Sequence, residues 1–120
     1  LFLAQRQGNW EEYCEKCLEN LEKYYWDDAY KLNQIAWNVF ENSEDGQNLE
    51  QALVWAERAV QLDPKSHAIL DTYANLLLVN NQAKKALEAE NQAIALAKAD
   101  GADVSGYKKV VEKIEASLGL

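Results

Sequence analysis

Residues 67–100, HAILDTYANLLLVNNQAKKALEAENQAIALAKAD, decide the fold of this chain. Ser66 before the stretch is a helix N-cap, and Asn81 within it tolerates the left-handed conformation that ends helices. We therefore predict two antiparallel helices over 67–79 and 83–99. Their apolar residues recur at three- and four-residue steps, as one helix face requires: Leu70, Tyr73, Ala74, Leu77, Ala86, Leu87, Ala93 and Ile94.

The same pattern occurs one unit earlier in the chain. Ala52 precedes Ala86 by 34 residues, and Ala59 precedes Ala93 by the same distance. A fixed period of this size is typical of stacked helix pairs. Residues 29–42 and 49–62 are the corresponding helices. About four extra residues fall in a polar loop within 41–48, which contains turn-forming residues. Such arrays present a surface for binding, so the pattern favours binding over chemistry.

Two further helices flank the repeated part. The spacing of apolar residues predicts one helix over 9–26, with Asn9 as its cap, and a closing helix over 105–118, with Ser105 as its cap. The sequence therefore predicts one all-α domain over 1–120 with about six helices. Ala36 should face Ala52 and Ala59, because small residues allow two helices to approach closely. Trp55 lies between those alanines, and we expect its ring to point partly outward.

The chain resembles the tetratricopeptide repeat family. The resemblance covers a first unit at 29–66, with the loop insertion, and a near-regular second unit at 67–100. The helix over 9–26 resembles half of an incomplete unit. In this family the first helix of each unit lines a concave groove, which implies a protein- or peptide-binding face. The groove candidates are Tyr30, Asn33, Trp37, Glu41, Asp71, Asn75 and Leu78.

Two aromatic residues of the groove helix have a second interpretation. Trp37 either lines the groove or is buried by the preceding helix, whereas Phe40 is expected in the core. Tetratricopeptide domains that grip a terminal carboxylate use cationic groove residues. Asn33, Asp71 and Asn75 supply none here, which argues against that subtype.

Composition narrows the choice of partner. The net charge is −8, which disfavours nucleic acid and anionic membrane surfaces. No apolar run approaches the ~18 residues of a membrane span. The chain begins at Leu1 and contains no methionine. We interpret it as an excised domain or a processed protein, with room for a targeting segment upstream.

No catalytic, cofactor or metal site is predicted. Cys14 and Cys17 have a spacing used by redox and zinc sites. They lie inside a predicted helix, with no preceding strand and no nearby set of about four ligands. We interpret them as reduced, partly buried residues that pack like small hydrophobes. His67 has no paired acid or nucleophile in the sequence and is read as an ordinary surface residue.

Two alternative functions remain open. Short stretches resemble the helical tail of bacterial thioredoxin-like proteins: Gly8-Asn9-Trp10, Leu32-Asn33, Ala36-Trp37 and Asp71-Thr72-Tyr73-Ala74. That resemblance implies an accessory tail in a bacterial envelope compartment; without it, a cytoplasmic location is expected. The other alternative is self-association into homo-oligomers through the amphipathic end helices.

Overall fold

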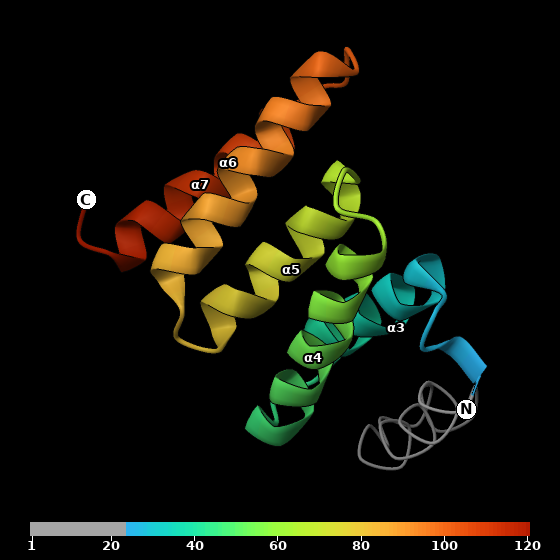
Figure 1. Cartoon of the computed structure of the whole chain (residues 1–120). Coiled ribbons are helices and arrows are strands. Elements are labelled where there is room, and N and C mark those ends of the chain that lie inside the picture. Colours follow the sequence, from blue (N-terminus) through green and yellow to red (C-terminus); the bar gives the residue numbers. More distant parts are fainter. Residues whose placement is uncertain (1–23) are drawn as a thin grey trace.

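The computed structural model describes residues 24–120, and the regular elements from residue 29 onward are all α-helices (Figure 1). The five helices follow one another along the chain: α3 (Ala29–Asn42), α4 (Gly46–Leu62), α5 (His67–Val79), α6 (Ala83–Ala99) and α7 (Ser105–Ser117). The helix expected over 9–26 lies almost wholly outside the described residues. Cys14 and Cys17 both lie outside them. In the described part, no helix is long and apolar enough to cross a membrane.

The predicted helix ends are confirmed where a polar side chain fixes them. Asp28 caps α3 by accepting a hydrogen bond from the Lys31 backbone N–H at 3.1 Å. Ser66 caps α5 in the same way, accepting from the Ile69 N–H at 3.3 Å. Asn81 has a φ of 65°, so it occupies the left-handed region after α5 as expected.

The loop between α3 and α4 is shorter than expected. α4 begins at Gly46 and not near Leu49, because Asp45 acts as its N-cap. The Asp45 carboxylate accepts hydrogen bonds from the backbone N–H groups of Gln47 at 2.8 Å and Asn48 at 3.4 Å. Part of the insertion therefore extends the helix by nearly one turn, and the loop is reduced to residues 43–45.

The start of α7 also differs from the prediction. Ser105 is the first helical residue and does not act as a cap. Asp103 instead accepts hydrogen bonds from the Ser105 backbone N–H at 3.0 Å and from its hydroxyl at 2.9 Å. These contacts lower the pKa of the exposed Asp103 carboxyl, with the backbone hydrogen bond as the larger cause. A charged acceptor has replaced the expected hydroxyl at this turn.

Each helix packs against the next one in the chain, and α5 also contacts α3 and α7. Figure 1 shows α5 and α6 running antiparallel side by side, with α7 along the far side of α6. The predicted small residues at the helix contacts are all completely buried: Ala36, Ala52, Ala59, Ala74, Ala86 and Ala93. This is consistent with a helix-pair arrangement, because residues without bulky side chains let helix axes approach closely.

Trp55 corrects one expectation about the first helix pair. Its exposed fraction is 0%, whereas the sequence suggested a ring pointing partly outward. The indole packs in the core that α3, α4 and α5 share, together with Leu32 and Leu76. The alanines near Trp55 in the sequence have small side chains, which leaves room for its ring in a closely packed core.

Candidate functional site

The predicted binding residues divide between two neighbouring helices. α3 carries Tyr30, Asn33, Trp37 and Glu41, and α5 carries Asp71, Asn75 and Leu78. Within each helix the spacing of three or four residues places the set along one face. Because α3 and α5 contact each other, the structure brings the helices that carry both sets together. The role of these residues in binding stays a prediction.

The α3 residues differ in how much of each side chain is accessible. Tyr30 is 70% exposed, and Glu41 is also exposed, while Asn33 and Trp37 are half-buried. The Asn33 side-chain oxygen is buried and has no hydrogen-bond partner. A buried amide oxygen without a donor is costly, so a rotation of the half-buried Asn33 side chain that brings this oxygen to a partner's donor would be favourable.

Trp37 and Phe40 form a stacked pair on α3. Their ring centroids are 5.0 Å apart with an interplanar angle of 26°. Phe40 packs against the core that α3, α4 and α5 share, as expected, and is half-buried. Trp37 is half-buried too and its ring packs on Phe40. The preceding helix lies almost wholly outside the described residues, so the choice between groove lining and burial by that helix stays open.

Asn75 is less accessible than a groove residue was expected to be. Its side chain is only 6% exposed, and its amide donates to the Asp71 carbonyl at 2.9 Å and to the Asp71 carboxylate at 3.2 Å. Asn75 therefore holds the Asp71 side chain in place, and the half-buried Asp71 is the group that a ligand would meet.

Sequence reasoning missed the residue beneath Asp71. Glu90 on α6 has an exposed fraction of 0%, and its carboxyl group lies within hydrogen-bonding reach of Asp71. Neither Glu90 oxygen finds a donor group in the structure. A signal existed, because Glu90 follows Ala86 by four residues and precedes Ala93 by three, which places it on the buried face of α6.

Burial controls the proton balance of this carboxyl pair. The pKa of Glu90 is raised to about 9, mainly by removal from water and further by the hydrogen bond to Asp71 and the Asp71 charge. Burial also raises the pKa of Asp71, while hydrogen bonds from Glu90 and Asn75 oppose that effect. At neutral pH, Glu90 therefore keeps its proton and can donate it in a hydrogen bond to Asp71.

His67 and Tyr107 extend this polar cluster to α7. Nδ1 of His67 is 2.8 Å from the Tyr107 hydroxyl, and Nε2 of His67 is 3.8 Å from the Asp100 carboxylate. Burial raises the pKa of Tyr107, and the charges of Asp71 and Glu90 raise it further. His67 is thus a half-buried link between α5 and α7, which corrects its interpretation as an ordinary surface residue.

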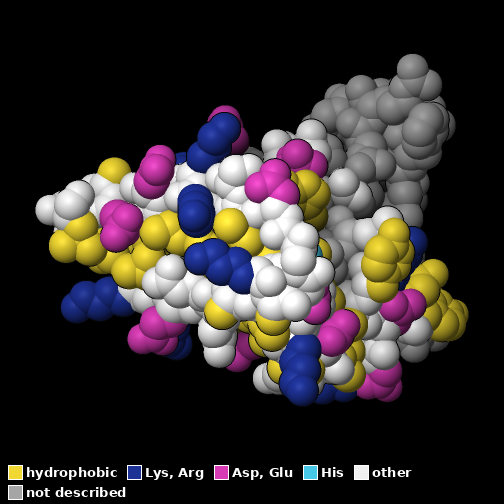
Figure 2. Space-filling model, turned by 90° about the horizontal axis from the view of Figure 1, so that it is seen from above, with side chains coloured by type: hydrophobic (Ala, Val, Ile, Leu, Met, Phe, Trp, Pro, Cys, Tyr) yellow, Lys and Arg dark blue, Asp and Glu magenta, His cyan; other side chains and the backbone are white. Residues whose placement is uncertain are grey.

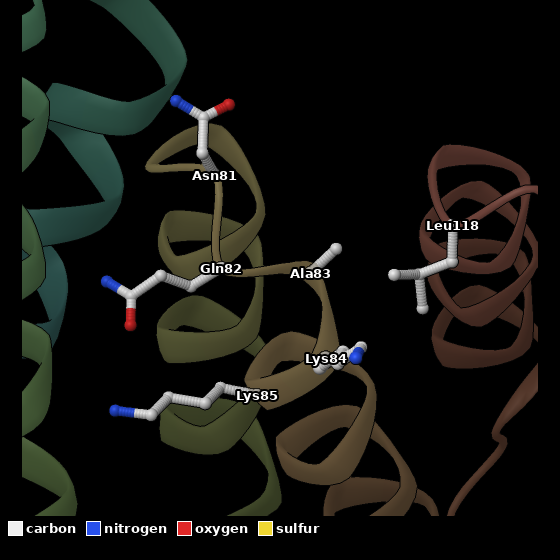
Figure 3. Close-up of a pocket in the computed structure, with 6 residues that line it drawn as sticks. All are labelled: Asn81, Gln82, Ala83, Lys84, Lys85 and Leu118. Carbon is white, nitrogen blue, oxygen red and sulfur yellow. The ribbon is translucent and has the colours of Figure 1, made fainter.

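A pocket lies elsewhere, at the turn between α5 and α6. Its volume is about 400 Å³, and it contains none of the predicted binding residues. In Figure 3, Ala83 and Leu118 face each other across it, whereas Gln82 and Lys85 point to the opposite side. Its lining residues are Asn81, Gln82, Ala83, Lys84, Lys85 and Leu118.

Metal ligands and surface charge give the described residues no further site. In residues 24–120, no group of three or more His, Cys, Asp or Glu side chains is arranged to hold a metal ion. Figure 2 shows one face on which acidic and basic side chains are interspersed with hydrophobic ones. On that face neither sign of charge dominates, so charge selectivity there would depend on local groups.

Comparison with known proteins does not add a functional assignment. No family model matches this chain, and no curated protein matches it in sequence.

Proposed function

We propose that this domain is a non-catalytic helical-repeat module of the tetratricopeptide type that binds a protein or peptide segment on the surface shared by α3 and α5. The direct contact between α3 and α5 carries the proposal. These helices are separated in the chain by α4, so each is the first helix of its own predicted unit. Their contact brings the two rows of candidate residues onto adjacent helices, as a shared groove requires.

The chemistry of the two rows suits an extended or helical segment. Tyr30 and Trp37 offer aromatic area, and the Asn33 amide, whose oxygen is buried without a donor, can turn to accept a hydrogen bond from a partner's backbone N–H. Aromatic side chains supply much of the binding energy at protein interfaces, and precisely placed polar groups orient the partner. Leu78 on α5 is half-buried and adds an apolar contact seven residues along the helix from Asp71.

The test uses peptides selected by the wild-type domain from a random library displayed on phage. Replacing Asn33 by alanine should weaken their binding about three- to tenfold, the effect of losing one hydrogen bond. Asn75→Ala should also weaken binding, because it releases the Asp71 side chain. Asn91→Ala is the matched control, since Asn91 is an exposed residue of α6. Circular dichroism should show unchanged helix content in all three variants.

Unchanged peptide binding in both the Asn33 and Asn75 variants would reject the α3–α5 surface. Self-association is separated by measuring mass against protein concentration on a sizing column. A dimer that dissociates on dilution, combined with no peptide selection, would favour the alternative of an oligomerisation module.

A further inference from the structure

We propose that the Asp71–Glu90 carboxyl pair selects partner segments that present a lysine or arginine side chain to the α3–α5 surface. This inference rests on the proposed function and specifies the chemistry of its partner. Asp71 is the accessible member of the pair, and Glu90 lies beneath it on α6.

The pair has no cation of its own. In the part of the chain that the structure describes, Arg58 forms an ion pair with Asp27, and Nε2 of His67 lies 3.8 Å from the Asp100 carboxylate. Neither involves Asp71 or Glu90. Asp71 receives hydrogen bonds from the neutral amide of Asn75, which leaves its negative charge without a countercharge. A positively charged group at this position would form the charge-assisted hydrogen bond that the domain itself does not provide.

Glu90 supplies an independent reason to expect a ligand here. Its side chain is fully buried, yet both carboxyl oxygens lack a donor. The Glu90 proton is donated to Asp71, so the unsatisfied atom is the remaining carboxyl oxygen, and a buried polar atom without a partner points to a functional role. A cation bound to Asp71 would act on Glu90 across a short distance in a poorly solvated region, where electrostatic interactions are strong.

A side chain with an aliphatic stem fits this location better than a small ion. Leu78 lies seven residues after Asp71 on the same face of α5, and the ring of Tyr107 is close enough to Asp71 for the two groups to interact electrostatically. Lysine and arginine can place their stems along apolar surface while the charged end reaches a carboxylate. The net charge of the chain, −8, also favours encounter with a basic partner.

Cation binding should be coupled to a proton. The groups that face Glu90 are Asp71 on α5 and Tyr107 on α7, with His67 beside Tyr107. A bound ammonium or guanidinium group favours the ionised form of Glu90 and so opposes its raised pKa. Binding should therefore release protons near neutral pH.

The experiment compares selected peptides as well as protein variants. The wild-type domain selects from a random phage-displayed library, and the common features of the bound peptides are read by sequencing. We expect a lysine or arginine at one fixed position. Replacing that residue in a synthetic peptide by norleucine, which keeps the stem but lacks the charge, should weaken binding about tenfold or more. This measurement uses the unaltered protein and does not depend on the folding of any variant.

Protein variants then locate the contact. Asp71→Asn should remove the preference between the basic peptide and its norleucine form, while Glu88→Gln, an exposed position on α6, should keep it. Calorimetry in phosphate and in Tris, buffers with different ionisation enthalpies, should report proton release with the basic peptide only.

The outcomes separate this inference from the proposed function. Peptides whose binding depends on Asn33 but not on a basic residue would overturn the inference and leave the function intact. A basic preference that survives Asp71→Asn would overturn it as well, because the cation would then bind elsewhere. If no selected peptide depends on α3 or α5, both the function and the inference fail.

Discussion

The hydroxyl of Tyr107 lies 2.8 Å from Nδ1 of His67, and this hydrogen bond joins α7 to the first turn of α5. The two rings also meet edge to face, with centroids 5.7 Å apart. Tyr107→Phe keeps the ring contact and removes the hydrogen bond. We expect the free energy of unfolding to fall by about 0.5–1.5 kcal/mol, measured by urea denaturation.

Tyr30→Phe is the control for that prediction. The Tyr30 hydroxyl accepts a hydrogen bond from the Gln34 amide at 3.2 Å, but this contact is exposed within one helix. Its loss should change stability by less than about 0.5 kcal/mol. Equal effects from the two substitutions would show that the Tyr107 hydrogen bond does not hold α7 in place.

Glu90 makes the stability of the domain depend on pH. Its pKa is about 9 in the folded protein and near 4.5 ordinarily. Between these values the unfolded chain loses the Glu90 proton while the folded protein keeps it. The free energy of unfolding therefore falls as pH rises from about 4.5 to about 9. Asp71, whose pKa is also raised, contributes in the same direction.

Glu90→Gln should reduce that pH dependence. A glutamine amide can donate to Asp71 without ionising, so the variant should be more stable than wild type at neutral pH by about 1–3 kcal/mol. The two proteins should converge near pH 4. Glu88→Gln, on the exposed side of α6, should follow the wild-type curve. A Glu90 variant that is destabilised equally at every pH would contradict the proton assignment.

The N-cap of α4 can be tested in a similar way. Asp45 accepts hydrogen bonds from two backbone N–H groups, and Asp45→Ala removes both. We expect a loss of about 1 kcal/mol in the free energy of unfolding, with Asp45→Asn close to wild type. Glu44→Ala, the exposed neighbour, should have little effect. If Glu44→Ala costs as much as Asp45→Ala, the extra turn of α4 does not depend on this cap.

The helices were predictable where a local signal fixed them. α3 and α6 begin and end at the expected residues, because an apolar stripe and clear stop residues coincide there. The start of α4 could not be predicted from the sequence, because Asp45 lies among turn-forming residues and can belong either to a loop or to a helix cap. At that position the cap outweighs the turn signal, and the backbone hydrogen bonds to Asp45 show why.

The candidate site was harder to predict, because its parts come from four helices. The rows on α3 and α5 follow from spacing within each helix. The contact between His67 and Tyr107 spans 40 residues, and only tertiary packing creates it. Glu90 was overlooked for a different reason. Its spacing from Ala86 and Ala93 places it on the buried face of α6, but carboxylates are rarely fully buried, so a glutamate is not expected there.

Trp55 provides the strongest test of the helix packing. The ring is completely buried between α3, α4 and α5, and its indole N–H has no hydrogen-bond partner. Trp55→Ala should therefore lower the free energy of unfolding by roughly 3–5 kcal/mol, through lost burial and the cavity left behind.

Because that loss is a large fraction of typical domain stability, Trp55→Phe is the companion variant. It keeps much of the ring and removes the unpaired N–H, so it should cost clearly less than alanine. Val54→Ala, at a side chain 47% exposed, is the control for α4 itself. If urea denaturation gives Trp55→Ala and Val54→Ala the same loss in the free energy of unfolding, the indole does not fill the space between the helices.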